Sequence, residues 1–222
     1  MRSKLRFRCL VLDHDDTVME STRCIHYPAF LQGMRKLRPE VDMSLEDFFR
    51  MNFHPGIETY YREVLRLSQE EYDWEFRFWQ DYTRRHVPRV YPGMERIIRR
   101  QREGGGFVCV SSHSVAEQIR RDYAANALPA PELVYGWELP PERRKPAPFA
   151  LEEIMTRLGL SREELVMVDD LRFGCDMAAG CGVTAVGAGW AHEIGEIREY
   201  MERHCDLYCD SPRMLEDFLF PG

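Results

Sequence analysis

The sequence FRCLVLDHDDTV at residues 7–18 decides the fold of this chain. Residues 7–12 are apolar or β-prone apart from Arg8, and three aspartates and a threonine follow almost at once. A short apolar run that ends in acids is typical of a buried strand in a parallel sheet, whose carboxyl end borders a ligand-binding crevice. We therefore expect Asp13 and Asp15 to face one crevice at the edge of a sheet.

The spacing of Asp13 and Asp15 points to paired acid chemistry. Two carboxylates in one site repel each other, which raises the pKa of one of them. Such a difference in pKa suits two separate roles, in which one acid attacks the substrate and the other transfers a proton. A divalent cation would relieve the remaining repulsion. The alternative is that Asp15 or Asp16 caps a helix or shapes a turn.

Hydroxyl and acidic side chains follow two later apolar segments. Residues 107–110 lead into Ser111 and Ser112, where hydroxyl and free amide groups could bind a phosphoryl oxygen. Ser114 is placed to start the next helix. Residues 165–168 lead into Asp169 and Asp170, acids of the kind that hold Mg²⁺.

Lys145 lies between these two segments and is followed by Pro146 and a predicted helix. A lysine there can neutralise both an attacking carboxylate and a phosphoryl group. Arg143 and Arg144 are adjacent cations that would serve equally well on charge alone.

In this order, the four segments resemble the four motifs of the haloacid dehalogenase superfamily. Asp13–Thr17 is similar to the first motif, DxDxT, and Lys145-Pro146 to the common form of the third. The resemblance implies three sets of site residues: Asp13, Asp15 and Lys145 as catalytic groups; Ser111, Ser112 and Lys145 as phosphate-binding groups; and Asp13, Asp15 through its backbone carbonyl, and Asp170 as ligands of Mg²⁺.

This sequence departs from the family pattern at the first and fourth motifs. Asp16 and Asp169 stand at positions where glycine is common, and Gly174 stands where a second acid is often found. Asp169 and Asp176 are both candidates to replace that acid.

The rest of the chain predicts an α/β fold with an insertion. Helical patterns fill residues 19–90, whereas strands and helices alternate from residue 91 onward. We predict a Rossmann-like parallel sheet with helices on both faces, formed by residues 1–18 and 91–222, and an inserted α-helical cap domain at 19–90. The position of the insertion resembles the cap of the phosphoglycolate phosphatase and β-phosphoglucomutase branch.

Composition and charge limit the classes of partner and the cellular location that we expect. The net charge of −7 disfavours a nucleic-acid partner, and no apolar run approaches the ~20 residues that span a bilayer. Seven scattered cysteines without a CxxC pair predict reduced thiols and a cytoplasmic protein. Aromatic residues lie on two faces of a predicted helix at 72–82, which makes a homodimer through the cap possible.

These patterns together predict a Mg²⁺-dependent phosphatase that acts on a small phosphorylated metabolite through an aspartyl-phosphate intermediate. One alternative is a phosphomutase of the β-phosphoglucomutase type, which would share the core residues. Another is a non-catalytic binding or regulatory protein on the same fold.

Overall fold

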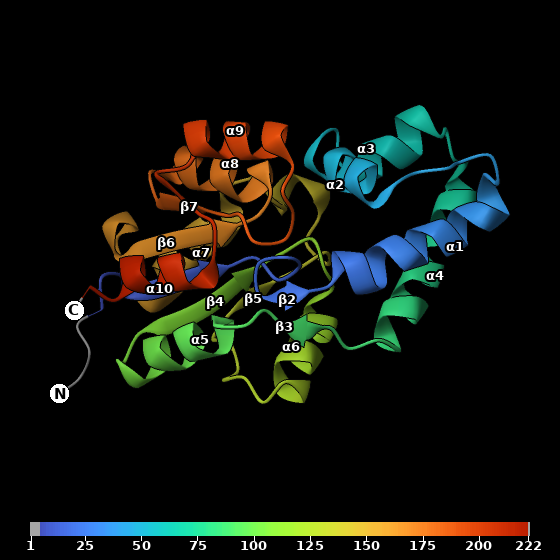
Figure 1. The fold of residues 1–222 in the computed structure, drawn as a ribbon. Coiled ribbons are helices and arrows are strands. Elements are labelled where there is room, and N and C mark those ends of the chain that lie inside the picture. The colour runs from blue at the N-terminus through green and yellow to red at the C-terminus, as the bar shows by residue number, and fades with distance from the viewer. Residues whose placement is uncertain (1–4, 222) are drawn as a thin grey trace. The chain divides into compact units, whose positions relative to one another are not determined.

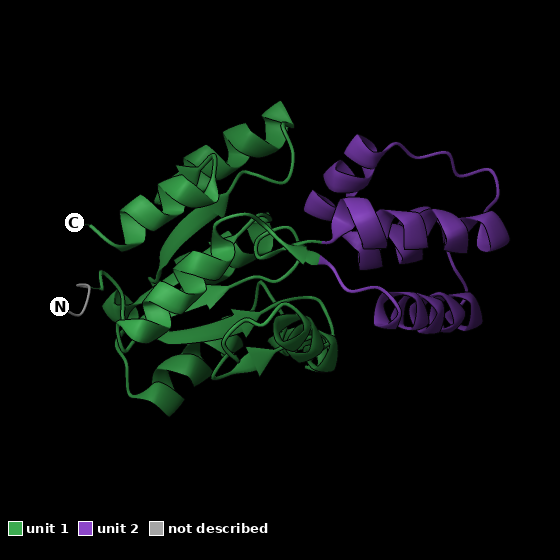
Figure 2. Cartoon of the chain, turned by 60° about the horizontal axis from the view of Figure 1, so that its bottom comes forward, with its two compact units in different colours: residues 1–20, 89–222 green, residues 21–88 purple. Residues whose placement is uncertain are grey.

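The chain forms two compact units, and the computed structural model describes residues 5–221. Unit 1 comprises Met1–Glu20 and Arg89–Gly222, and unit 2 comprises Ser21–Pro88 (Figure 2). The two connections between the units are paired, because β2 (Met19–Glu20) runs antiparallel to β3 (Arg89–Val90). Unit 2 is therefore an insertion that leaves and re-enters unit 1 through a two-stranded ribbon.

Within the described residues, unit 1 contains a six-stranded sheet in the order β5-β4-β1-β6-β7-β8, and every pairing in it is parallel. Its strands are β1 (Cys9–Leu12), β4 (Phe107–Ser111), β5 (Val134–Tyr135), β6 (Leu165–Asp169), β7 (Thr184–Ala188) and β8 (Leu207–Cys209). All residues of β1 and β6 are buried, as strands covered on both faces require. This confirms the predicted parallel sheet, and the strand order places β1 between β4 and β6 near its centre.

Helices cover both faces of the sheet, as predicted (Figure 1). They are α5 (Met94–Glu103), α6 (Ala116–Ala125), α7 (Phe149–Leu158), α8 (Arg172–Cys181), α9 (Gly195–His204) and α10 (Pro212–Leu219), with short 3₁₀ turns at Pro141–Arg143 and Arg162–Glu164. Right-handed crossovers place α5 and α6 on one face and α7, α8 and α9 on the other. An ion pair between Arg96 of α5 and Glu216 of α10 holds α10 on the first face.

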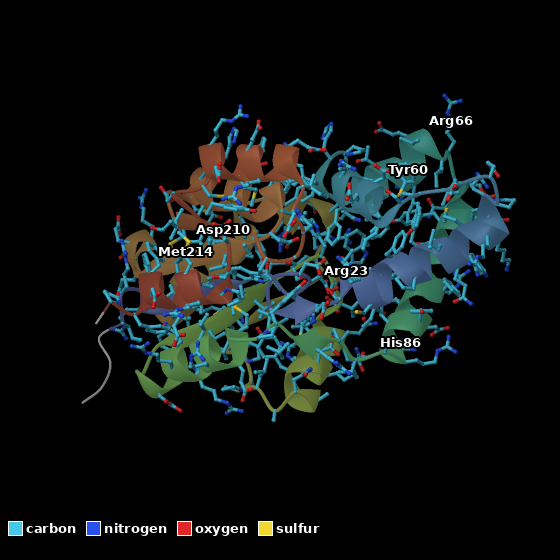
Figure 3. All side chains as sticks on the ribbon, viewed as in Figure 1. Arg23, Tyr60, Arg66, His86, Asp210 and Met214 are labelled. Atoms are coloured by element: carbon cyan, nitrogen blue, oxygen red, sulfur yellow. A yellow bond between two sulfur atoms is a disulfide. The ribbon has the colours of Figure 1, made fainter. Side chains whose placement is uncertain are left out.

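Unit 2 is helical. It contains a π-helical turn at Thr22–His26, α1 (Tyr27–Leu37), α2 (Leu45–Phe53), the short α3 (Ile57–Thr59), a second π-helical turn at Tyr60–Val64, and α4 (Gln69–Arg84). Phe30, Met34 and Phe48 are buried in its own apolar core. Arg66 follows the second π turn, and its exposed side chain extends away from the ribbon (Figure 3). Within residues 5–221, no helix has the length and apolar character that crossing a membrane would require.

Two of the seven cysteines differ from the sequence-based expectation of free thiols. Cys175 of α8 and Cys205, which follows α9, form a disulfide with their Cα atoms 6.0 Å apart. The other five are free. The expectation was wrong at this pair because neighbouring helices on one face bring together residues 30 positions apart, and sequence spacing does not reveal that contact.

The core of unit 2 also buries an acid. Glu75 of α4 is 5% exposed, and one of its carboxyl oxygens accepts a 2.7 Å hydrogen bond from the hydroxyl of Tyr61. Desolvation raises the pKa of Glu75 from 4.5 to about 7, although the Tyr61 hydrogen bond opposes the shift. Above that pH the folded state holds a buried charge, which costs free energy.

Replacing Glu75 with glutamine should therefore stabilise unit 2 at neutral and alkaline pH. In the unfolded chain Glu75 loses its proton at a lower pH than in the folded chain, so its contribution to stability falls as the pH rises between these pKa values. We expect Glu75→Gln to raise the free energy of unfolding by roughly 2–3 kcal/mol at about pH 8 and by less than about 1 kcal/mol at about pH 5. Urea unfolding followed by tryptophan fluorescence, to which Trp74 and Trp79 of α4 contribute, measures this. Glu70→Gln, at an exposed position of the same helix, is the control, and equal pH profiles for the two variants would contradict the prediction.

Candidate active site

Two neighbouring strands end at one edge of the sheet and carry acidic residues there. β1 pairs with β6 so that Leu12 lies opposite Val168, and the Asp13 amide extends the ladder by donating to the Val168 carbonyl at 2.9 Å. Asp13, Asp169 and Asp170 are each no more than 4% exposed. Carboxylate oxygens from these three residues lie within 4.8 Å of one another. The apolar strands thus hold three carboxylates together in a buried position.

Lys145 bridges two of these carboxylates. Its Nζ lies 2.7 Å from Oδ1 of Asp13 and 2.5 Å from Oδ2 of Asp169, and the residue is 8% exposed. Burial opposes the charged ammonium, but the charges of Asp13 and Asp169 outweigh that effect and raise the pKa of Lys145 above its ordinary value. Lys145 is therefore a fixed positive charge, and the structure brings it to Asp13, one of the two predicted catalytic acids.

Two acids of this cluster, Asp169 and Asp170, are shifted toward their protonated forms. Desolvation raises the pKa of Asp169 to about 7, although the charge of Lys145 opposes the rise. Desolvation, followed by the charges of Asp169 and Asp13, raises the pKa of Asp170. The cluster thus holds three carboxyl groups and the Lys145 ammonium, which bridges two of them. Hard oxygen ligands with surplus negative charge fit a divalent cation such as Mg²⁺.

The loop after β1 is fixed by contacts to several elements of unit 1. The Ser114 hydroxyl donates a short hydrogen bond to Oδ2 of Asp15. Thr17 donates to Oδ1 of Asp170 at 3.3 Å, and Tyr91 donates to Oδ1 of Asp16 at 3.3 Å. Asp16 has a φ of 56°, a left-handed conformation that glycine adopts most readily. The Asp15 side chain is thus held by Ser114, and its role as a metal ligand through the backbone carbonyl stays a prediction.

The segment after β4 lies next to Asp13 in the sheet. Leu12 pairs with Val110, so buried Ser111 is one position further along, beside Asp13. Ser112 is also buried, and its hydroxyl accepts from the Ser114 amide at 3.2 Å. The structure therefore brings Ser111 to the acidic edge, whereas the Ser112 side chain shapes the following turn. A role for either serine in phosphate binding stays a prediction.

The structure distinguishes the two candidates for the second acid of the fourth motif. Asp169 belongs to the cluster, whereas Asp176 lies 3.4 Å from Arg172 in an ion pair on the surface of α8. A Cβ atom at Gly174 would lie 2.2 Å from Oδ2 of Asp169. Asp169 thus fills the space that a side chain at position 174 would need, which explains why glycine replaces the usual acid there.

Two contacts of the second-motif segment escaped the sequence analysis. Ser114 was expected to start a helix, but α6 begins after Val115, and Ser114 binds Asp15 instead. His113 donates from Nε2 to the Lys145 carbonyl at 3.0 Å. Burial and the charge of Lys145 lower the pKa of His113 to about 3, so the ring is neutral. Ser114 and His113 both lie just beyond the end of a central strand. That position in the sequence could have marked them as candidates for contacts in the site.

A parallel sheet with a lysine-bridged carboxylate cluster at its carboxyl edge defines an α/β protein with an enzyme-like acidic site. A comparison with protein-family models makes the assignment specific. The model described as haloacid dehalogenase-like hydrolase matches residues 10–188. The chain therefore belongs to the haloacid dehalogenase-like hydrolases, as the four motifs indicated.

Solved structures share the fold over almost the whole chain. A predicted phosphoglycolate phosphatase from Haemophilus somnus superposes with a TM-score of 0.73 at 16% identity, covering 96% of this chain and 97% of that one. A putative phosphatase from Clostridium difficile gives 0.75 at 12% identity, with 97% and 100% covered. The CbbY protein of Rhodobacter sphaeroides, in complex with xylulose-(1,5)bisphosphate, gives 0.72 at 17% identity, with 93% and 95% covered. A comparison with curated proteins found no match.

Proposed function

We propose that this chain is a Mg²⁺-dependent phosphatase that hydrolyses a small phosphorylated metabolite through an aspartyl-phosphate on Asp13. The observation that carries the proposal is the position of Lys145 Nζ, 2.7 Å from Asp13 and 2.5 Å from Asp169. A buried ammonium fixed beside a carboxylate can hold a phosphoryl group against that carboxylate despite their like charges.

In the proposed mechanism, a carboxylate oxygen of Asp13 attacks phosphorus and the bond from phosphorus to the leaving oxygen breaks. Asp15, held by Ser114, gives its proton to the departing alkoxide. Asp15 then takes a proton from the water that hydrolyses the aspartyl-phosphate, which releases phosphate and restores Asp13. Lys145 and the groups at Ser111 and Ser112 stabilise the charge on the phosphoryl oxygens.

The donor set supports a magnesium ion in this mechanism. Asp13, Asp170 and the Asp15 carbonyl would hold it, with Asp169 nearby. When bound, Mg²⁺ offsets the charge on the phosphoryl oxygens and on the carboxylates.

Unit 2 is proposed to act as the cap that reads the leaving group. Similar structures include proteins described as phosphoglycolate phosphatases and a protein bound to xylulose-(1,5)bisphosphate, which supports a small phosphorylated substrate. Association of two copies through unit 2 stays a prediction, which light scattering would test.

Release of inorganic phosphate tests the proposal. With Mg²⁺, the purified chain should release phosphate from p-nitrophenyl phosphate and from members of a panel of phosphorylated sugars and glycolate. Chelation with EDTA should lower the rate by at least about 10²-fold, and added Mg²⁺ should restore it. Transfer of phosphate between positions of a sugar without release would support the phosphomutase alternative instead. No turnover across the panel would contradict both.

Mg²⁺ should also raise the unfolding temperature in the absence of substrate. A ligand that binds only the folded state adds about 2.7 kcal/mol of stability at a concentration 100 times its Kd. Calorimetry with and without Mg²⁺ measures this independently of activity. Because Asp170 is part of the proposed metal site, Asp170→Asn should reduce the shift.

A further inference from the structure

His14 lies between the two predicted catalytic acids, and its side chain is tied to a neighbouring helix. The residue is 2% exposed, and its Nε2 lies 3.1 Å from Oδ2 of Asp122 in α6. The other oxygen of Asp122 accepts from Arg121 Nε at 2.9 Å, and Asp122 is 4% exposed. Removing one partner of a buried polar pair leaves the other uncompensated, so this pair holds the two elements together.

The backbone of His14 closes the turn that follows Asp13. Its carbonyl accepts hydrogen bonds from the amides of Val18 at 3.1 Å and Met19 at 2.9 Å. Asp15, Asp16 and Thr17 are therefore enclosed in a turn whose first carbonyl belongs to His14. A displacement of His14 would move the whole turn, including Asp15.

The His14 ring is buried against an aromatic neighbour and forms its hydrogen bond through Nε2. It stacks on Tyr123 with ring centroids 6.0 Å apart, and among the described residues its Nδ1 is buried without a hydrogen-bond partner. Because a carboxylate only accepts, Nε2 carries the proton that binds Asp122. The orientation of the ring thus depends on Asp122.

The same helix segment reaches the turn at a second point. Ser114, just before α6, donates to Asp15, while Asp122 in the later part of α6 accepts from His14. The Asp15 turn is therefore held by two hydrogen bonds on consecutive residues, one from Ser114 just before α6 to Asp15 and one from His14 to Asp122 within α6. Two such attachments restrict both the position and the orientation of the Asp15 carboxyl group.

We propose that His14 and Asp122 are a pair of positioning residues that hold Asp15 in line for proton transfer to the leaving group. The inference rests on the proposed phosphatase function and deepens it. It assigns a role to His14 and Asp122, which are not among the groups proposed to react with or bind the substrate. A proton donor that is misplaced by about 1 Å can lose about 10²-fold in rate.

The dependence of the rate on the leaving group distinguishes positioning from a purely structural role. Alkoxides need a proton as they depart, whereas p-nitrophenolate departs readily without one. We expect His14→Leu to lower kcat/KM for phenethyl phosphate by about 10²-fold and kcat/KM for p-nitrophenyl phosphate by less than about 5-fold. The ratio kcat/KM reports the steps up to departure of the leaving group, so it excludes the later hydrolysis of the aspartyl-phosphate, in which Asp15 also acts. Asp122→Leu should give the same pattern. The double variant should lose no more than either single one, because both remove one interaction.

Conservative and control variants complete the test. His14→Gln keeps an N–H donor and should recover most of the activity on phenethyl phosphate. Asp122→Asn keeps an acceptor and should show a smaller loss with the same selectivity, so the inference stays testable if a leucine variant does not fold. Glu117→Gln, exposed on α6, should match the wild type on both substrates.

Equal losses of kcat/KM on the two substrates, or additive losses of kcat/KM in the double variant, would overturn the positioning role. Those outcomes leave the proposed phosphatase intact, because the wild type would still turn over. A wild type that releases no phosphate from either substrate would instead overturn the proposed function, and with it this inference.

Discussion

Replacing Asp13 with asparagine should lower kcat for phosphate release by about 10⁴-fold or more. Asparagine keeps the size and shape of the side chain but cannot act as an anionic nucleophile. Lys145 would keep its contact with Asp169, so the variant should fold. The large loss is expected because no other carboxylate of the cluster stands at the end of β1 in the place of Asp13.

The measurement is steady-state release of phosphate, together with the intact mass of the protein after acid quenching. The wild type should carry a covalent phosphate adduct during turnover, and the Asp13→Asn variant should carry none. Asp217→Asn, at an exposed position of α10, is the matched control and should behave as the wild type. Full turnover by Asp13→Asn would remove Asp13 as the nucleophile.

Local signals explain why much of the fold was predictable. The apolar run before Asp13 indicates a buried strand by itself, and the structure confirms it as β1 at the centre of the sheet. Ser211 precedes Pro212, a pair that favours a helix start, and the Ser211 hydroxyl accepts from the Met214 amide at 3.4 Å. Ser68 and Glu71 have the spacing of a capping box and form one at α4. Each of these features is decided by residues within one turn or one strand.

Features that depend on distant contacts were not predictable. The pairs Cys175–Cys205 and His14–Asp122 join residues on different elements, and neither has a local pattern. Residues 57–67 have a helical pattern, but the hydrogen bond from the Leu65 amide to the Tyr60 carbonyl spans five residues and makes a π turn there. The spacing of apolar residues does not distinguish an α-helix, whose hydrogen bonds span four residues, from a π turn, whose hydrogen bonds span five.

The acidic cluster is another feature that the sequence alone did not resolve, because it depends on contacts between distant residues. The sequence left Asp169 and Asp176 as equal candidates, because both follow Val168 closely. Only the packing of Gly174 against Asp169 shows which side chain occupies the space beside Lys145.

Replacing Lys145 with methionine should reduce both activity and stability. Without the ammonium, Asp13 and Asp169 are buried carboxylates that lose their shared partner. Removing one partner of a buried ion pair costs about 3–5 kcal/mol, and removing one group that stabilises transition-state charge costs about 10²–10³-fold in kcat. Arg143→Met is the matched control. Arg143 is exposed and lies over the ring of Phe149 at 4.8 Å, so its loss should cost less than about 1 kcal/mol.

The pH dependence of the Lys145→Met variant identifies the cause of its instability. Loss of the positive charge raises the pKa of Asp169 further, so the folded variant holds a proton that the unfolded chain releases. Its stability relative to the wild type should therefore fall as the pH rises from about 5 to about 8. Urea unfolding at these two pH values measures the difference. A loss that is independent of pH would mean that Lys145 acts through packing and not through its charge.

Mg²⁺ gives a second readout on the same variant. If the carboxylates repel one another in the absence of Lys145, a divalent cation should stabilise Lys145→Met more than it stabilises the wild type, because it supplies part of the missing positive charge. Activity should stay low even at saturating Mg²⁺, since the ion cannot replace an ammonium fixed 2.7 Å from the predicted nucleophile. Recovery of both stability and turnover would instead show that Lys145 contributes charge alone and that its position beside Asp13 is not needed for catalysis.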